Sequence, residues 1–509
     1  MAIPLSRMGD FLAHWTARKP DQQALVFQDR SWTWAELDDR VRRAASALRA
    51  AGLSAGDRFA VLDKNHPACL ELTLAASIIG AVNVVVNFRL APDELVHVLD
   101  DSTAKLVVVG AEFAGTLDGI RDRLPSVCRT VVLGGEKDEY EQWLAQEEPL
   151  AELPTTSADD CFLQLYTSGT TGWPKGAMLT QRSMTAHTNA VAPAYAMDED
   201  TVNIVAMPLF HVGGTSWALG SMATGGRTVV VREVTEVLQE VAKHQATHVF
   251  LVPAVIQALI QHPQTPQALG SVRVLAYGGS PMPLDVMNQV LEKLSTPLYS
   301  VYGMTEMSGA FCCLKPEEHR DESRRHLLAS AGRILPGTEL RVVDPTTGQD
   351  VPTGQLGEFW VKSEQVMAGY WRNPEATRET ITEDGWLRTG DAGRVDEDGY
   401  LYIEDRVKDM IITGGENVYP AEVERVLAQH PDVAEVAVVG VPHEKWGETP
   451  KAVVVLKEGA TLDEQGLIDF TREKLAHYKC PTSVTAVAAL PRNPTGKILR
   501  RELRAQFQS

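Results

Sequence analysis

The N-terminal part of the chain alternates short, mostly apolar runs with longer amphipathic segments. The runs at residues 59–62, 82–86 and 106–109 have the length of buried strands, and the segments between them carry apolar residues at helical spacing. Strands that are apolar on both faces and alternate with helices are typical of parallel sheets covered on both sides. The same alternation continues in the runs at residues 228–231, 249–252 and 272–276. The pattern therefore predicts an α/β fold with mostly parallel, stacked sheets.

Local signals near the N-terminus predict the first elements. Residues 23–34 form two alternating runs around Asp29-Arg30, which is the pattern of a hairpin. Thr33 and Glu36 have the spacing of a capping box, and Gly52 ends the apolar periodicity that follows. A helix is therefore expected directly after the hairpin.

Beyond about residue 330 the pattern changes to short strands separated by Gly, Pro and Asp, at residues 339–343, 358–361 and 399–403. This texture predicts a small β-rich subdomain. A charged break at residues 405–409 precedes an α+β tail with segments at 421–427, 434–439 and 451–456. We expect a large N-terminal domain over residues 1–407 and a small α+β domain over residues 408–509.

Composition narrows the function classes. The 509 residues are 44% hydrophobic and 23% charged, which is typical of a globular chain with more than one domain. A net charge of −19 without a long basic block argues against nucleic acid or anionic lipid as a partner. The six cysteines form no C-x-x-C pair, there is no signal-peptide core and no run of eighteen apolar residues. The prediction is a cytoplasmic protein without a membrane span; its oligomeric state is left open, a homodimer included.

The stretch from Tyr166 to Gly176 is too poor in apolar residues to be core material. It follows the strand-like run 161–166 and precedes the helix-like run 179–183. Its glycines, hydroxyls and lysine suit a polyphosphate, because they combine close backbone approach with donors and positive charge. It is not the ordinary P-loop, since Lys175 stands between Pro174 and Gly176. The alternative is a polar surface loop; the candidate phosphate ligands are Thr167, Ser168, Gly169, Thr170, Thr171 and Lys175.

Four further stretches accompany this loop along the chain: Tyr302 to Glu306, Thr389 to Asp391, Asp405 to Lys408 with Gly414 to Asn417, and Pro494 to Lys497. Together the five resemble the adenylate-forming superfamily of acyl-CoA synthetases, peptide-synthetase adenylation domains and beetle luciferases. The resemblance spans nearly the whole chain. It implies an AMP-forming reaction in which a carboxylate attacks the α-phosphorus of ATP, pyrophosphate leaves, and a thiol takes the acyl group.

The resemblance also implies roles for residues around the nucleotide. Glu306 is similar in position to the family's magnesium-associated glutamate, and Thr305 to the hydroxyl beside the phosphates. A second cation near the phosphorus would help, because charge builds up there. Asp391 would accept from the ribose hydroxyls and Arg406 would reach the ribose or phosphate, the alternative for Asp391 being a turn aspartate. The turn at Gly278, Gly279 and Ser280 resembles the adenine-binding turn, and Tyr302 would give the base a flat face, unless these residues only pack. Gly303 and Met304 are further nucleotide-binding candidates.

Two lysines near the C-terminus have implied roles in catalysis and movement. Lys497 matches the lysine that bridges the carboxylate and the α-phosphate in the family, whereas without the resemblance it would be a plain surface lysine. Lys408 occupies the hinge about which the small domain rotates between the two half-reactions.

The acid and the thiol are indicated by fewer residues. His211, in a Met-Pro-Leu-Phe-His-Val-Gly-Gly stretch, resembles the histidine near the carboxylate in acyl-CoA synthetases; the alternative is a packed histidine. No Asp is present there to pair an ammonium, so a fatty or other hydrophobic acid is favoured over an amino acid. Coenzyme A is favoured as the thiol, with a carrier-protein phosphopantetheine as the alternative. The residues that resemble CoA contacts are Arg89, Gly414, Gly415, Trp446 and Tyr478.

Overall fold

The computed structural model describes residues 7–167, 173–413, 416–443, 446–475, 477–492 and 498–507. The chain divides into two compact units. Unit 1 comprises residues 1–339 and 362–387, and unit 2 comprises residues 340–361 and 388–509. Unit 2 joins the β-rich segment to the C-terminal elements, so the domain boundary expected between residues 407 and 408 stays a prediction.

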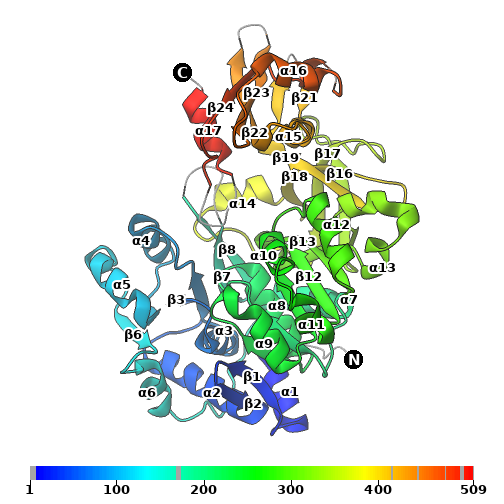
Figure 1. The fold of residues 1–509 in the computed structure, drawn as a ribbon. Coiled ribbons are helices and arrows are strands. Elements are labelled where there is room, and N and C mark those ends of the chain that lie inside the picture. Colours follow the sequence, from blue (N-terminus) through cyan, green and yellow to red (C-terminus); the bar gives the residue numbers. More distant parts are fainter. Residues whose placement is uncertain are drawn as a thin grey trace. The chain divides into compact units, whose positions relative to one another are not determined.

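A six-stranded sheet of unit 1 is buried on both faces. In β3 (Arg58–Leu62), Phe59 and Val61 pack in one core with α2, α3 and α6, whereas Ala60 and Leu62 pack in another with α4 and α5. Figure 1 shows these helices around β3 in the blue and cyan part of the chain. The strand order is β6 (Arg129–Leu133), β5 (Leu106–Gly110), β3, β4 (Val82–Val86), β7 (Cys161–Thr167) and β8 (Lys175–Thr180), with only β8 antiparallel to its neighbour.

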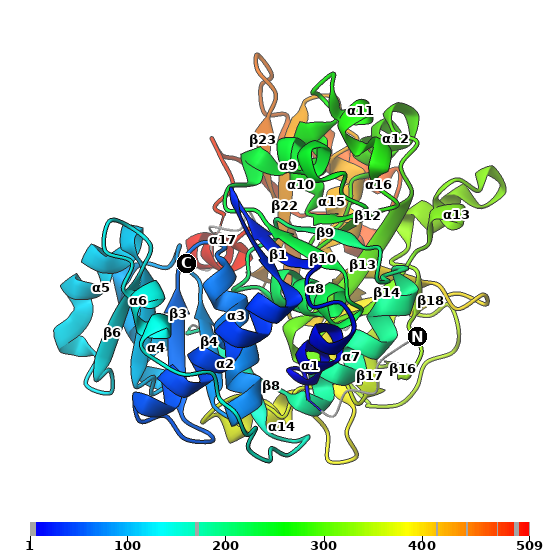
Figure 2. The ribbon, with the colours of Figure 1, turned by 90° about the horizontal axis from the view of Figure 1, so that it is seen from below.

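A nine-stranded sheet forms the other half of unit 1. Helices α9, α10 and α12 cover one face of its central strands, and α7 and α8 cover the other. Figure 2 shows both groups of helices beside β9, β10 and β13. The strand order is β15 (Arg333–Ile334), β14 (Gly309–Cys313), β13 (Leu298–Met304), β12 (Val274–Gly278), β11 (His248–Leu251), β9 (Val202–Val205), β10 (Arg227–Val230), β1 (Gln23–Phe27) and β2 (Arg30–Thr33).

The helices of unit 1 are short to medium in length. They are α1 (Asp10–Arg18), α2 (Trp34–Ala50), α3 (Pro67–Ile79), α4 (Pro92–Asp101), α5 (Ala114–Ile120), α6 (Glu139–Ala145), α7 (Gln181–Ala194), α8 (Val212–Ala223), α9 (Val237–His244), α10 (Pro253–Leu259), α11 (Thr265–Ala268), α12 (Leu284–Lys293), α13 (Pro316–His319) and α14 (Pro374–Thr380). No helix of the ranges given above is long and apolar enough to cross a membrane.

Unit 2 contains the β-rich segment and the C-terminal α+β elements. The four-stranded sheet runs β16 (Thr338–Val343), β17 (Gly357–Ser363), β18 (Leu387–Val395) and β19 (Leu401–Arg406). A five-stranded sheet follows, with β21 (Glu416–Val418), β20 (Ile411–Thr413), β23 (Gly447–Leu456), β22 (Val433–His443) and β24 (Ser483–Ala486). The helices are α15 (Pro420–Leu427), α16 (Glu464–Arg472) and α17 (Arg500–Phe507).

The predicted N-terminal hairpin and helix are confirmed. Strands β1 and β2 pair antiparallel, and the capping box joins the Thr33 side chain to Glu36 N–H and the Glu36 side chain to Thr33 N–H. The helix-like reading of residues 179–183 is wrong in part. Leu179 and Thr180 belong to β8, and helix α7 begins at Gln181 with Thr180 as its N-cap. The expected break at 405–409 also starts late, because β19 continues through Arg406.

Candidate active site

The carboxyl ends of β12 and β13 bring two predicted nucleotide-binding stretches side by side. The strands are parallel, and Gly278 faces Val301 across the ladder. A Cβ atom at Gly278 would lie 2.2 Å from the Val301 carbonyl oxygen, so only glycine allows this close approach. Gly279 has φ +78°, and Ser280 is exposed beyond it. This edge of a parallel sheet is where open α/β folds bind ligands.

Tyr277, the residue before this turn, is held by a hydrogen bond to a buried histidine. Tyr277 Oη donates to His319 Nε2 at 2.8 Å, and His319 Nδ1 donates to the Lys315 carbonyl oxygen at 2.7 Å. Because a carbonyl only accepts, the ring proton sits on Nδ1 and Nε2 is the acceptor. Burial lowers the pKa of His319 to about 4. The pair therefore stays neutral at pH 7 and supports the Gly278–Ser280 turn.

The second stretch turns sharply after β13. Tyr302 is half-buried, with its ring centroid 4.8 Å from that of Phe311. A Cβ atom at Gly303 would lie 2.1 Å from the Gly309 carbonyl oxygen, so β14 can approach only a glycine. Met304 then leads into the 3₁₀ turn η5 (Thr305–Met307), in which Glu306 is 8% exposed.

A tyrosine connects this glutamate to the predicted phosphate lysine. Tyr370 Oη donates to Glu306 Oε1 at 2.6 Å, and Lys175 Nζ lies 4.3 Å from the centroid of the Tyr370 ring. Lys175 begins β8 and pairs with Thr167 at the end of β7. Ser168, Gly169, Thr170 and Thr171 lie outside the described residues. The two predicted charged groups are thus brought to one aromatic side chain.

The surroundings of Glu306 fit a magnesium ion. Among the described residues, no lysine, arginine or histidine forms an ion pair with this buried carboxylate. Buried charges are normally paired or bound to a metal. The described residues also contain no group of three His, Cys, Asp or Glu that could hold a metal alone. One carboxylate together with substrate phosphates is the usual way in which Mg²⁺ is bound.

The predicted acid-binding histidine stands at the start of α8. His211 is the N-cap residue, and its carbonyl oxygen accepts from Gly214 N–H at 2.9 Å. A Cβ atom at Gly214 would lie 2.2 Å from the Pro208 carbonyl oxygen, so the tight turn needs glycine. Asn65 anchors the same turn, because its Oδ1 accepts from Leu209 N–H at 2.9 Å.

Arg89 lies close to this segment. Its guanidinium carbon is 5.0 Å from the centroid of the Phe88 ring and 5.6 Å from that of Phe210. The Phe210 ring in turn lies 4.4 Å from the His211 ring, between centroids. Arg89 is exposed, as a predicted contact to a CoA phosphate would require.

The remaining predicted site residues belong to unit 2. Asp391 lies in β18, is 6% exposed and pairs in register with Arg406 of β19. Trp446, in the β22–β23 connection, is 45% exposed, and Tyr478 is 42% exposed. Gly414, Gly415 and Lys497 lie outside the described residues, as do the side chains of Arg406 and Lys408. The ribose, CoA, hinge and catalytic-lysine assignments in this unit stay predictions.

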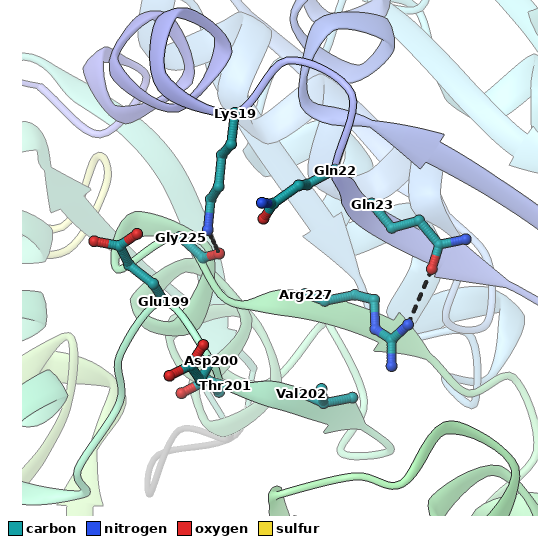
Figure 3. Close-up of a pocket in the computed structure, with 9 residues that line it drawn as sticks. All are labelled: Lys19, Gln22, Gln23, Glu199, Asp200, Thr201, Val202, Gly225 and Arg227. Carbon is teal, nitrogen blue, oxygen red and sulfur yellow. Dashed lines mark hydrogen bonds between the residues drawn. The ribbon is translucent and has the colours of Figure 1, made fainter.

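Unit 1 also carries an open cavity of about 280 Å³ (Figure 3). Within it Lys19 Nζ donates to the Gly225 carbonyl oxygen at 2.7 Å, and Arg227 donates to Gln23 Oε1 at 3.0 Å. The side chains of Glu199 and Asp200 also line it, so its charges are mixed. None of the motif residues contributes to this cavity.

Sequence reasoning missed Tyr370 and Asn65. Tyr370 stands in a Gly-Tyr-Trp-Arg-Asn-Pro run that by itself indicates only a turn before a helix. Asn65 follows β3, where a polar residue is unremarkable as a strand end. Their roles depend on contacts with residues far along the chain, and no local pattern signals them.

Comparisons with known proteins agree with this architecture. The AMP-binding enzyme family matches residues 12–371, and the AMP-binding enzyme C-terminal domain matches residues 422–497. The chain is 40% identical to a feruloyl-CoA synthase of Amycolatopsis sp, over 97% of this chain and 99% of the relative. It is 36% identical to a fatty acid–[acyl-carrier-protein] ligase of Streptomyces coeruleorubidus, over 96% of this chain and 94% of the relative.

A solved structure extends the likeness to three dimensions. ATP-bound MatB from Rhodopseudomonas palustris superposes with a TM-score of 0.88 at 32% identity, covering 98% of this chain and 99% of that chain. The predicted resemblance and α/β fold are therefore confirmed. The chain belongs to the AMP-binding enzyme family within the adenylate-forming superfamily, and it is an AMP-forming acyl-CoA ligase that uses ATP, Mg²⁺ and CoA.

Proposed function

We propose that the enzyme activates a hydrophobic carboxylic acid, fatty or aromatic, and transfers its acyl group to CoA. The observation that carries this proposal is the aromatic cluster beside the His211 turn. A Cβ atom at Gly213 would lie 3.0 Å from Phe250, and the rings of Phe250 and Trp217 are 5.4 Å apart between centroids. Both rings are almost fully buried, at 3% and 4% exposure, so the protein beside the His211 turn is aromatic core and not polar surface.

The polar atoms of this cluster are already used within the protein. Trp217 Nε1 donates to Asn203 Oδ1 at 2.7 Å, and Tyr195 Oη donates to the Ser300 carbonyl oxygen at 2.9 Å. The indole N–H of Trp217 and the hydroxyl of Tyr195 are therefore not offered to a ligand, which disfavours an ammonium or a second carboxylate beside them. The named activities of the relatives, on ferulate and on fatty acid, are compatible with either choice of hydrophobic acid.

The chemistry would follow two balanced steps. A carboxylate oxygen of the acid attacks the α-phosphorus of ATP, the bond to the bridging oxygen breaks, and pyrophosphate leaves. The thiol sulfur then attacks the acyl carbon, its proton goes to solvent, and the bond to AMP breaks.

Glu306 would hold Mg²⁺, which offsets phosphate charge when bound. Lys175 would bind phosphate, the Gly278–Ser280 turn and Tyr302 would hold adenine, and Asp391 would accept from the ribose.

The choice of CoA over a carrier protein rests on Arg89, Trp446 and Tyr478. An exposed arginine suits a phosphate, and exposed rings suit an adenine, whereas a carrier protein offers neither group in the same form. One relative is named as a ligase that joins fatty acid to an acyl-carrier protein, so the experiment below also offers that acceptor. A reduced cytoplasmic location, which the six free cysteines favour, stays a prediction. The oligomeric state also stays a prediction.

The decisive experiment measures AMP formation over a panel of acids from acetate to palmitate, including cinnamates, indoleacetate and cyclic acids. Each acid is offered with CoA and, separately, with a phosphopantetheinylated carrier protein. CoA-dependent AMP release with a hydrophobic acid is the expected result. Turnover with the carrier protein alone, or with short polar acids alone, would overturn the proposal.

A half-reaction test examines the predicted catalytic lysine. Lys497→Ala should reduce ATP–pyrophosphate exchange by about a hundredfold or more, the scale of losing a preorganised charge-stabilising group. Thioester formation from supplied acyl adenylate should persist. Equal losses in both half-reactions would contradict the role of Lys497.

A further inference from the structure

Backbone hydrogen bonds hold the segment around Tyr370 on two sides. On one side Trp371 N–H donates to the Gly176 carbonyl oxygen at 2.8 Å, and Met178 N–H donates to that of Gly369 at 3.0 Å. On the other side Met367 N–H donates to the Glu306 carbonyl oxygen at 2.9 Å. The segment therefore lies between the strand that begins with Lys175 and the turn that carries Glu306.

The side chain of Tyr370 is equally constrained. It is 6% exposed, so the ring cannot turn away into solvent. Its hydroxyl donates to Glu306 Oε1 at 2.6 Å, which is the short distance of a hydrogen bond to an ionised acceptor. Its ring face lies 4.3 Å from Lys175 Nζ, a cation–π distance.

We propose that Tyr370 is a positioning residue that sets the metal-binding carboxylate of Glu306 and the phosphate-binding ammonium of Lys175 relative to one another. This inference rests on the proposed roles of those two residues. The phenol occupies one lone pair of Oε1 and fixes the carboxylate orientation, while the ring holds the ammonium without neutralising it. A carboxylate in this place would neutralise Lys175 and compete with the phosphates for it.

The test compares Tyr370→Phe with a matched control. Tyr370→Phe keeps the ring beside Lys175 and removes only the hydroxyl. Tyr140→Phe removes the same kind of bond elsewhere in unit 1, where Tyr140 Oη donates to the buried Glu71 carboxylate at 2.8 Å. The probes are Mn²⁺ with ATP, titrated without acid and followed by calorimetry, and the dependence of pyrophosphate exchange on Mg²⁺ concentration.

Tyr370→Phe should weaken Mn²⁺–ATP binding and raise the apparent KM for Mg²⁺ about 10- to 100-fold, the scale of one hydrogen bond to a charged group. The KM for the acid should not change. Tyr140→Phe should lower the melting temperature and leave both metal parameters within twofold of the parent. In a Glu306→Gln background, Tyr370→Phe should add little, because the two residues act together.

An unchanged metal dependence in Tyr370→Phe would overturn the inference, whatever happened to the melting temperature. So would an equal change in Tyr140→Phe. Failure of the proposed function has a different signature, since the parent enzyme would then show no Mg²⁺-dependent pyrophosphate exchange with any acid of the panel.

Discussion

Asn65 and Leu209 are 144 positions apart in the chain, yet the Asn65 side chain accepts a hydrogen bond from the Leu209 backbone at 2.9 Å. The Asn65 Nδ2 group also donates to the carbonyl oxygens of Met207 and Val231, at 3.0 and 3.1 Å. Asn65 follows β3 of the six-stranded sheet, and Val231 follows β10 of the nine-stranded sheet. One amide thus ties the ends of two sheets to the turn that carries His211.

Asn65→Ala should raise the KM for the acid about tenfold and lower stability by about 1–3 kcal/mol, because buried backbone groups lose their partners. Steady-state kinetics and urea unfolding measure the two effects. Asn83→Ala is the matched control: Asn83 is fully buried and donates to Thr73 Oγ1 at 2.9 Å in the core beside β4. If both variants lost stability and neither changed the acid KM, Asn65 would be a structural residue only.

The sequence predicted those parts of the site that local chemistry encodes. Glycines at 278 and 303 are needed because a neighbouring strand leaves no room for Cβ, so the motifs that contain them are visible as Gly-rich strand ends. The parallel order of β12 and β13 then brings the two motifs to one edge. Tyr370 and Asn65 were not predictable, because each acts through a partner 64 or 144 positions away.

Strand β8 illustrates another limit. Its sequence, Lys-Gly-Ala-Met-Leu-Thr, has neither clear alternation nor a continuous apolar run, and Gly176 weakens it further. Hydrogen bonding to β7 stabilises β8 as a strand despite its low intrinsic strand propensity. A Cβ atom at Gly176 would lie 2.5 Å from Gln164 Nε2, so a larger residue there would have to displace the Gln164 side chain.

Gly303→Ala should reduce adenylation by about a hundredfold. The added Cβ would press on the Gly309 carbonyl oxygen from 2.1 Å and separate β13 from β14, which shifts Thr305 and Glu306. Displacements near 1 Å at a reacting centre cost on this order. Pyrophosphate exchange measures the loss. Gly119→Ala in α5, where nothing lies within 4 Å of the new Cβ, should gain up to about 1 kcal/mol of stability at parental activity. Parental exchange in Gly303→Ala would show that the strands tolerate the methyl group.

Buried histidines should make the protein sensitive to mild acid. Burial lowers the pKa of His248 and His319 to about 4, and that of His66 and His187 to about 3, from an ordinary value of 6.5. The unfolded chain therefore binds more protons than the folded one as the pH falls from 6.5 towards 4. Stability is full above 6.5 and should fall below it by roughly 1.4 kcal/mol per pH unit for each histidine.

Urea unfolding at pH 7.5, 6.0 and 5.0 measures this slope. His248→Asn keeps a donor for the Tyr195 carbonyl oxygen, which His248 Nε2 contacts at 2.9 Å, and removes one titrating group. The fall in the free energy of unfolding with decreasing pH should then be smaller by roughly 1.4 kcal/mol per pH unit, the contribution of one histidine. A stability that is flat between pH 6.0 and 5.0 in the parent would contradict the prediction.

Helix α4 contacts both flanks of the predicted phosphate-binding loop. His97 Nε2 donates to the Pro174 carbonyl oxygen at 3.1 Å and its ring stacks on Trp173, with centroids 4.7 Å apart. Asp101, one turn further on the same helix face, accepts from Tyr166 Oη at 2.6 Å. Trp173 is 55% exposed, so burial of its ring is a weak reason for the contact.

His97→Ala should therefore raise the KM for ATP about 5- to 30-fold, the sum of one neutral hydrogen bond and one ring stack, while the melting temperature changes little. His97→Phe keeps the stack without the donor and should fall between the parent and His97→Ala. The effect of Trp173→Ala should be smaller in the His97→Ala background than in the parent, because the two rings share one contact. If His97 only packs, the opposite result is expected: His97→Ala would lower the melting temperature by several degrees and leave the KM for ATP unchanged. Pyrophosphate exchange over a range of ATP concentrations, with melting curves for each variant, separates the two.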